Sequence, residues 1–257
     1  VFLGAGSAAV GVADQIVGVM HLDNPDKSLD ELRKNIFFVD SKGLVTKHRP
    51  GTLEKHKLPY AQDITTPLST LLDVVNHVKP TGLIGLSGQG GAFSEDIVRA
   101  HAKNNAKPII FALSNPTKNS ECTAEQAVQW TDGTCIFASG SPFQPVEHNG
   151  KVIRPGQGNN MYIFPGLGLG AVVSQAKHVS ELMVLAASQT LAAPTPQSKL
   201  DAGEIYPDLS HIRTISFHIA KAVAQQAVKE GLSTVQVDDW EPLLRDYIYE
   251  PQYVQRS

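Results

Sequence analysis

The chain has 257 residues, 42% of them hydrophobic, and a formal net charge of −3. This composition allows a sizeable core and excludes a disordered chain, and the slightly negative charge gives no reason to expect a nucleic-acid or membrane partner. Cys122 and Cys135 are too far apart for a close metal-ligand pair and too few for a disulfide framework, so we expect two buried structural thiols. No run reaches the roughly 18 apolar residues of a transmembrane helix, which predicts a soluble protein.

Up to Pro165, short apolar runs alternate with amphipathic stretches, which is typical of a parallel sheet covered by helices on both faces. The apolar runs predict strands at Val1–Leu3, Ile36–Asp40, Leu83–Leu86, Ile109–Ser114 and Cys135–Ser139. The stretches between them predict helices at Ala8–Met20, Leu29–Lys34, Pro67–His77, Ser94–Asn104 and Thr123–Thr131.

After Pro165 the pattern becomes helical. GLGLGAVVSQAKHVSELMVLAASQTLAA predicts two helices in series, and TISFHIAKAVAQQAVKEG predicts a helix that ends at Gly231. The proline-containing AAPTPQSKLDAGEIYPDLS predicts a loop. We therefore expect one domain over residues 1–257, an α/β fold with a Rossmann-like doubly wound parallel sheet and a helical C-terminal extension at about 166–257.

The first strand leads directly into GAGSAA. Gly4 and Gly6 take the first two positions of G-x-G-x-x-G/A, and Ala9 takes the third. The glycines allow a tight turn and a close approach of a pyrophosphate to the amides that begin a helix. Because glycine-rich turns also arise for packing alone, the motif by itself leaves both interpretations open.

The strand NIFFVD ends in Asp40, where a second Rossmann strand offers a carboxylate to ribose hydroxyls; the alternative is an ordinary turn residue. Basic residues follow it: Lys42, Lys47, Arg49 and Lys57. A 2′-phosphate would need such cations, so they favour NADP over NAD, although charge after a strand is also typical of a solvated surface.

Further polar loops follow the later strands. LSGQGGAF, with the next helix capped by Ser94, predicts a second set of exposed amides at the carboxyl edge of the sheet. In FALSNPT, Asn115 precedes a proline and offers both a donor and an acceptor to a carboxylate or carboxamide ligand, with an Asx turn as the alternative. PGQGNNMYIFPG places Asn159 and Asn160 before a strand-like apolar run.

Taken in order, GAGSAAVGVA, VDSKGL, ALSNPT, FASGSPF, GQGNNMYIFPG and IYPDLSHIR resemble the NAD(P)-binding domain of malic enzyme, over essentially the entire chain. The resemblance implies that the full-length parent oxidises and decarboxylates L-malate to pyruvate and CO2 with reduction of NADP or NAD and with help from Mg²⁺ or Mn²⁺. A malolactic enzyme, which releases lactate, and a non-catalytic dinucleotide-binding module are the alternatives.

The resemblance also assigns roles to individual residues. It implies cofactor binding by Gly4, Ala5, Gly6, Ser7, Ala8, Asp40, Ser41, Lys42, Lys57, Leu86, Ser87, Leu113 and Asn115. It implies contacts to the nicotinamide ribose or malate by Asn115, Asn159 and Asn160. Ser41, Lys42 and Lys57 resemble the NADP-using branch, with Lys55 as the rival of Lys57, whereas Ser7 departs from the glutamate that many relatives carry at this position.

In the family, the lysine base, the tyrosine acid and the metal carboxylates lie ahead of the glycine loop and have no counterpart here. We therefore expect no catalytic residue and no metal ligand in this chain, which resembles a malic enzyme cut at its first strand and inactive on its own. The parent is expected to be an intracellular homo-oligomer, either cytoplasmic or organellar.

Overall fold

The computed structural model describes residues 1–251. The chain forms two compact units, the first made of Val1–Asn159 with Gln197–Ile205 and the second of Asn160–Pro196 with the residues from Tyr206 onward. The first unit contains the sheet, and the second consists of helices.

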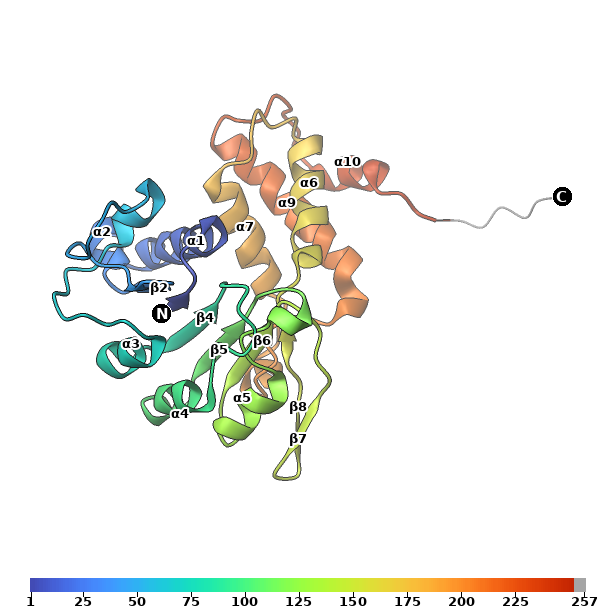
Figure 1. The fold of residues 1–257 in the computed structure, drawn as a ribbon. Helices are drawn as coiled ribbons and strands as arrows, with labels where there is room; N and C mark the ends of the chain where they lie inside the picture. The colour runs from blue at the N-terminus through green and yellow to red at the C-terminus, as the bar shows by residue number, and fades with distance from the viewer. Residues whose placement is uncertain (252–257) are drawn as a thin grey trace. The chain divides into compact units, whose positions relative to one another are not determined.

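The sheet of the first unit has seven strands in the order β3-β2-β1-β4-β5-β6-β9 (Figure 1). The strands are β1 (Phe2–Leu3), β2 (Phe38–Asp40), β3 (Gly43–Leu44), β4 (Gly82–Gly85), β5 (Ile109–Ala112), β6 (Ile136–Ser139) and β9 (Gly156–Gln157). All neighbours pair in parallel except β2 and β3. This order, in which the chain moves outward from β1 first in one direction and then in the other, confirms the predicted doubly wound sheet.

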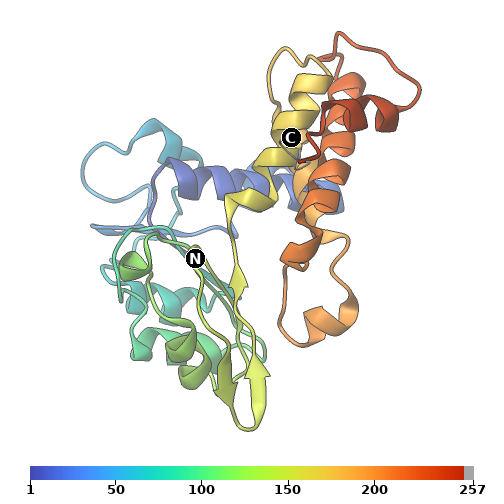
Figure 2. The same ribbon diagram turned by 90° about the vertical axis from the view of Figure 1, so that its right-hand side faces the viewer.

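Each of the five predicted strands coincides with an observed one, although the observed strands are one to two residues shorter or displaced at an end. The structure adds β3, β9 and a separate hairpin of β7 (Val146–His148) and β8 (Lys151–Ile153). These additions are only two or three residues long, too short to produce a recognisable apolar run. Figure 2 shows the hairpin extending from the end of the sheet.

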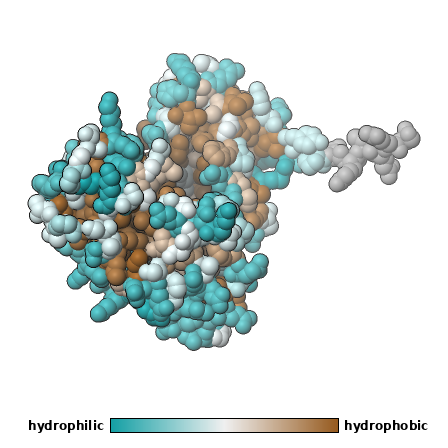
Figure 3. All heavy atoms as spheres, viewed as in Figure 1, coloured by the Kyte–Doolittle hydropathy of each residue, from teal (hydrophilic) through white to brown (hydrophobic). Residues whose placement is uncertain are grey.

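Helices cover the sheet on both faces. The helices of this unit are α1 (Ser7–Asp23), α2 (Leu29–Arg33), α3 (Leu71–Val78), α4 (Glu95–Lys103), α5 (Ala124–Trp130) and α8 (Gln197–Asp201), with short 3-10 helices η1 (Lys55–Tyr60) and η2 (Thr117–Asn119). The surface over α4 and α5 is mostly hydrophilic (Figure 3), as expected for helices that turn their apolar side to the sheet.

Alternate residues of the central strands enter two different cores. Phe2 and Phe38 belong to the core beneath α1, α2 and η1, whereas Leu3 and Val39 belong to the core beneath α3, α4 and α5. This division follows from the two-residue period of a strand, and it explains why both strands read as continuous apolar runs. Tyr60 of η1 closes the first core, with its ring 5.0 Å from that of Phe38.

The second unit contains η3 (Asn160–Tyr162), α6 (Phe164–Val173), α7 (Glu181–Ala192), η4 (Leu209–His211), α9 (Ile212–Lys229) and α10 (Trp240–Tyr247). The two helices in series and the helix ending before Gly231 agree with expectation, and Gly231 has φ +67°. Helix α6 lies alongside α9 (Figure 2), where Gly166 and Gly170 allow the two backbones to approach closely.

Two local predictions were wrong. The apolar run after Asn160 forms η3 and the start of α6 rather than a strand, because Pro165 at the first turn favours a helix. The proline-containing stretch predicted as a loop contains α8 and the beginning of η4. Ser94 is the N-cap residue of α4 as predicted, although its side chain makes no capping hydrogen bond.

Candidate functional site: the carboxyl edge of the sheet

The turn between β1 and α1 has the geometry of an anion-binding loop. Gly4 has φ +106°, and a Cβ at this position would lie 2.5 Å from the carbonyl oxygen of Leu86, so only glycine fits. Gly6 is the N-cap of α1, and the helix begins with Ser7 and Ala8, which are exposed. The first turn of α1 has no side-chain cap and no acidic residue. Its first amides therefore face outward with the positive end of the helix dipole, as phosphate binding requires.

Asp40, at the end of β2, is held by two cations. Its two oxygens accept hydrogen bonds of 2.8 Å each from the guanidinium of Arg49, and Nζ of Lys57 lies 3.4 Å away. The backbone amide of Lys42 donates a further bond of 2.9 Å. Burial disfavours ionisation of Asp40, but the bonds from Arg49 and Lys42 and the charges of Arg49 and Lys57 lower the pKa of this carboxyl below its usual value.

The 3-10 helix η1 connects this cluster to the glycine loop. His56 donates a hydrogen bond of 3.0 Å from Nε2 to the carbonyl oxygen of Ala5, while the neighbouring Lys57 contacts Asp40. Lys57 also lies 3.3 Å from Glu54, whose side chain is 65% exposed and so screens the lysine only weakly. Of the two rival lysines, Lys57 is the one beside Asp40, and Lys55 is exposed.

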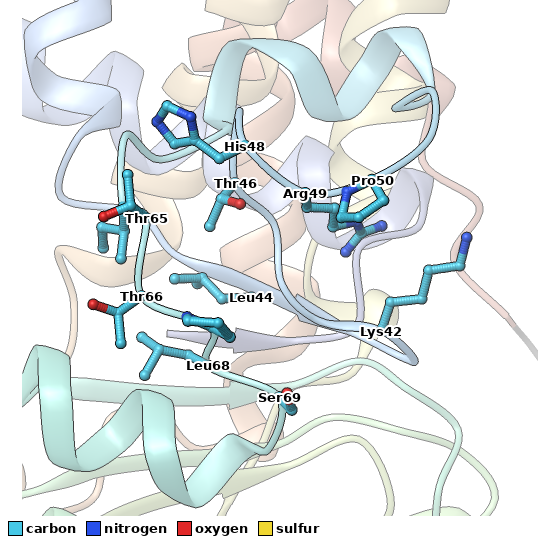
Figure 4. A pocket seen from close by; sticks show the side chains of 12 residues that line it. Lys42, Leu44, Thr46, His48, Arg49, Pro50, Thr65, Thr66, Leu68 and Ser69 are labelled. Carbon is cyan, nitrogen blue, oxygen red and sulfur yellow. The ribbon is translucent and has the colours of Figure 1, made fainter.

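A cavity of about 490 Å³ adjoins the same cluster. Figure 4 shows Thr65, Thr66 and Leu68 on one side of it and His48, Arg49 and Pro50 on the other. Its lining is Lys42, Leu44, Thr46, His48, Arg49, Pro50, Ile64, Thr65, Thr66, Pro67, Leu68 and Ser69. Apolar, hydroxyl and cationic side chains thus surround open space next to Asp40, whereas Ser41 lies at the exposed turn that begins β3.

The second glycine loop differs from the first, because its amides are already bonded. The amide of Ser87 donates to Glu121, that of Gly88 to Ser114 Oγ and that of Gln89 to Ser87 Oγ. A Cβ at Gly90 would collide with the carbonyl oxygen of Lys118. Gly90 thus serves close packing, whereas Gly88 and Gly91 adopt the positive φ of +70° and +74° that favours glycine. The expected second set of ligand-binding amides is not present at Ser87, Gly88 and Gln89.

Asn115 lies at the end of β5, two residues after the half-buried Leu113. It is exposed, and its peptide bond to Pro116 is cis. Oδ1 accepts a hydrogen bond of 2.7 Å from Ser141 Oγ, which follows β6. This bond orients the side-chain amide and connects the ends of two neighbouring strands at the edge that also carries the glycine loop.

The asparagine pair spans the boundary between the two units. Asn159 follows β9 and is the last residue before the boundary. Its backbone N–H donates a hydrogen bond of 3.0 Å to the carbonyl oxygen of Gln157. Asn160 begins the second unit as the first residue of η3 and is exposed. The first unit contains nearly all of the predicted site residues: residues 4–8, residues 40–42, Lys57, Leu86, Ser87, Leu113, Asn115 and Asn159. Asn160 belongs to the second unit.

Within residues 1–251, no three histidine, cysteine, aspartate or glutamate side chains come together in a way that could hold a metal ion. The residues that the structure describes therefore do not fit a complete Mg²⁺ or Mn²⁺ site, and we assign no chemical step to a metal held by them. Over the same residues, none of the helices combines the length and the apolar character needed to cross a bilayer.

Sequence reasoning missed three residues that shape this edge. The sequence shows Arg49 only as one of several cations after Asp40. In the structure the chain returns to the end of β2, and Arg49, nine residues after Asp40, pairs with that carboxylate. His56 and Glu121 carried no local signal, because each acts through a contact distant in the sequence, with Ala5 and with Ser87 respectively.

Comparison with known proteins gives a consistent family. The family described as "Malic enzyme, NAD binding domain" matches residues 1–228. An NADP-dependent malic enzyme of Dictyostelium discoideum is 54% identical over 255 residues, covering 98% of this chain and 46% of that protein. One of Vitis vinifera is 52% identical over 234 residues, covering 91% of this chain and 39% of that protein.

Solved structures agree at the level of the fold. The crystal structure of Entamoeba histolytica malic enzyme has a TM-score of 0.72 at 23% identity and covers 95% of this chain and 46% of that one. The malic enzyme of Pyrococcus horikoshii has a TM-score of 0.58 at 22% identity, covering 82% and 45%. The chain thus spans less than half the length of these relatives. Because residues 1–228 match the NAD-binding domain of malic enzyme and the relatives are more than half identical, the chain belongs to the malic enzyme family.

Proposed function

We propose that this chain is the coenzyme-binding part of an NADP-dependent malic enzyme, which converts L-malate to pyruvate and CO2 while reducing NADP. The observation that carries the proposal is the uncapped start of α1 behind Gly4, a position that only glycine fits. The relatives named as NADP-dependent malic enzymes support it.

In this proposal the two ends of the coenzyme meet different residues. The pyrophosphate lies on the amides of the Gly4–Ala8 turn, along a groove that includes Leu86, Ser87 and Leu113. The adenosine 2′-phosphate lies near Ser41, Lys42 and Lys57. Arg49 binds both oxygens of Asp40 through two bonds of 2.8 Å. Lys57, 3.4 Å from Asp40 and 3.3 Å from Glu54, would therefore turn from these carboxylates to a dianionic phosphate. NAD, which lacks this phosphate, is the weaker coenzyme.

Asn115, Asn159 and Asn160 contact the substrate or the nicotinamide ribose in this proposal. When bound, NADP would supply the hydride acceptor for C2 of malate, and the asparagine side chains would hold the donor carbon and the acceptor ring in register. The bond from Ser141 to Asn115 Oδ1 leaves the amide hydrogens as the donors for a substrate carboxylate.

The test uses the complete protein that contains this chain, supplied with L-malate, Mg²⁺ and either NADP or NAD. We expect pyruvate and CO2 in equal amounts and a higher kcat/KM with NADP. Release of lactate instead would identify a malolactic enzyme, and coenzyme binding without turnover would identify a non-catalytic module.

Asn115→Ala tests the substrate side of the same proposal. We expect a higher KM for malate and a lower kcat, with Asn76→Ala, an exposed position on α3, as the matched control. Unchanged kinetics in Asn115→Ala would remove this residue from the site.

The proposal extends to a homo-oligomeric, intracellular enzyme that works in the cytoplasm or in an organelle. Relatives from Oryza sativa and Zea mays are named chloroplastic. Size-exclusion chromatography with light scattering on the complete protein measures the assembly, and a monomer at micromolar concentration would contradict this part.

A further inference from the structure

Glu121 is a fully buried carboxylate in the loop between η2 and α5. Its Oε1 accepts hydrogen bonds from Ser87 N at 3.1 Å, Ser87 Oγ at 3.0 Å and Ser114 Oγ at 2.5 Å. Its Oε2 lies 3.4 Å from Ser114 N. A charge in such a position is tolerated only where it receives several bonds, and here all of them come from the ends of two strands.

The two serine hydroxyls both point their hydrogen at Glu121. Ser114 Oγ accepts from the amide of Gly88 at 2.9 Å, and Ser87 Oγ accepts from the amide of Gln89 at 3.1 Å. With these amides donating to the oxygens, each hydroxyl hydrogen is directed to the carboxylate. The chain of bonds therefore runs in one direction, from the backbone amides through the serine hydroxyls to the carboxyl oxygens of Glu121, which accept all of them.

Gly85, the last residue of β4, leaves room for this arrangement. A Cβ at Gly85 would collide with the carboxyl carbon of Glu121. The side chain thus rests directly on the backbone where β4 ends and spans to Ser114, where β5 ends. Ser114 is followed by Asn115, whose side chain is in turn fixed by Ser141 after β6.

We propose that Glu121 is a positioning residue for the hydride-transfer geometry: it fixes the exits of β4 and β5 so that Asn115 meets malate and the nicotinamide in register. This inference rests on the proposed function. Glu121 itself does not touch substrate. It acts through Ser114, the neighbour of Asn115, and through Ser87, which lines the groove proposed for the coenzyme, while the amides of the Gly4–Ala8 turn and the lysines proposed for the 2′-phosphate lie on other turns.

Glu121→Gln in the complete protein tests the proposal, because it keeps the volume but places an amide donor among the two serine hydroxyls. We expect kcat/KM for malate to fall about 10- to 100-fold, as for a misalignment of about 1 Å, while Kd for NADP rises by a clearly smaller factor, because the amides of the Gly4–Ala8 turn are unchanged. We also expect a larger primary isotope effect on kcat/KM with C2-deuterated malate, because misaligned hydride transfer becomes more rate-limiting. Glu125→Gln, an exposed glutamate on α5, is the matched control.

Ser114→Ala covers the case in which Glu121→Gln does not fold, since it removes one bond and retains the carboxylate. We expect a smaller loss of kcat/KM in the same direction, with the same rise in the isotope effect. Unchanged kcat/KM and isotope effect in these variants, or a parallel loss of NADP affinity, would overturn the inference while leaving the function intact. A wild-type protein that does not oxidise malate would overturn both.

Discussion

At the residue scale, Asp40 forms two ion pairs that its place in the sequence does not reveal. An acid at the end of a second Rossmann strand ordinarily binds ribose hydroxyls, but both oxygens of Asp40 are engaged by Arg49. The side chains of Asp40 and Arg49 are only 14% and 13% exposed, so water does little to weaken this bidentate pair. Lys57 pairs with the same carboxylate at 3.4 Å, so two cations hold Asp40.

At this residue scale, we expect Lys57→Gln in the complete protein to raise KM for NADP about 10- to 100-fold, since a bond between charged groups contributes about 1.5–3 kcal/mol. KM for NAD should change little, because NAD has no phosphate at that position. Steady-state kinetics with both coenzymes measure the ratio. An equal effect of Lys55→Gln, at an exposed position in the same 3-10 helix, would show that the lysine was wrongly chosen.

His101 gives a second prediction at the residue scale. It is fully buried, and its Nε2 lies 3.0 Å from the carbonyl oxygen of Ile109. Burial lowers the pKa of His101 below the ordinary value of 6.5, so the unfolded chain binds a proton more readily than the folded one. The stability that the neutral ring provides is present above pH 6.5 and is lost as the pH falls below it.

We therefore expect the urea midpoint of unfolding to fall between pH 7.5 and 5.5, and this slope to be smaller in His101→Gln than in the wild type. Chemical denaturation at several pH values measures it. His77→Gln changes an exposed histidine and should keep the wild-type slope. A slope in His101→Gln equal to that of the wild type would contradict the assignment.

At the scale of elements, the contact between α6 and α9 depends on small residues. A Cβ at Gly170 would lie 2.6 Å from the carbonyl oxygen of Ala220 and 2.7 Å from Cβ of Val223, which is fully buried. Gly168, on the same helix, has nothing within 4 Å of such an atom and is exposed. The two glycines thus occupy the same secondary structure in opposite environments.

We expect Gly170→Ala to lower the free energy of unfolding by about 1–3 kcal/mol, because the added methyl group overpacks the contact between the helices. Gly168→Ala should raise it by up to about 1 kcal/mol, since alanine favours a helix more than glycine does. Urea unfolding followed by circular dichroism compares the two variants. The same sign in both would show that helix propensity, and not packing, determines the result.

At the scale of the whole molecule, the two units should respond differently to coenzyme. The residues proposed to hold the pyrophosphate and the 2′-phosphate all belong to the first unit, and α9 belongs to the second. Saturating the complete protein with NADP at about 100 times Kd stabilises the folded state by about 2.7 kcal/mol through binding alone. Local protection of amides should be greatest where the phosphates bind.

Hydrogen–deuterium exchange with and without NADP measures this difference. We expect slower exchange over residues 4–10 and 40–57, and little change over residues 215–225 of α9, which serve as the internal control. Uniform protection of both regions would place the coenzyme elsewhere, and a lack of protection in the first region would contradict the phosphate loop.

The amino-acid sequence by itself determined the order and type of the main elements. Five strands and the helices between them follow from runs such as Ile109–Ser114, because a strand buried on both faces must be apolar throughout and a helix covering it must be amphipathic. The glycine turn was also predictable, since the φ of +106° at Gly4 excludes other side chains and the motif is local.

Only the tertiary structure decided which polar side chains cooperate. The same kind of glycine motif gives uncapped amides after Gly4 but bonded amides at Ser87, Gly88 and Gln89. Their acceptors are Glu121, 34 residues from Ser87 in the sequence, and the hydroxyls of Ser114 and Ser87. Arg49 and Lys57 likewise become partners of Asp40 only when η1 returns to the end of β2. Backbone pattern depends on neighbours along the chain, whereas the electrostatics of a site depend on groups that folding brings within about 3 Å of one another.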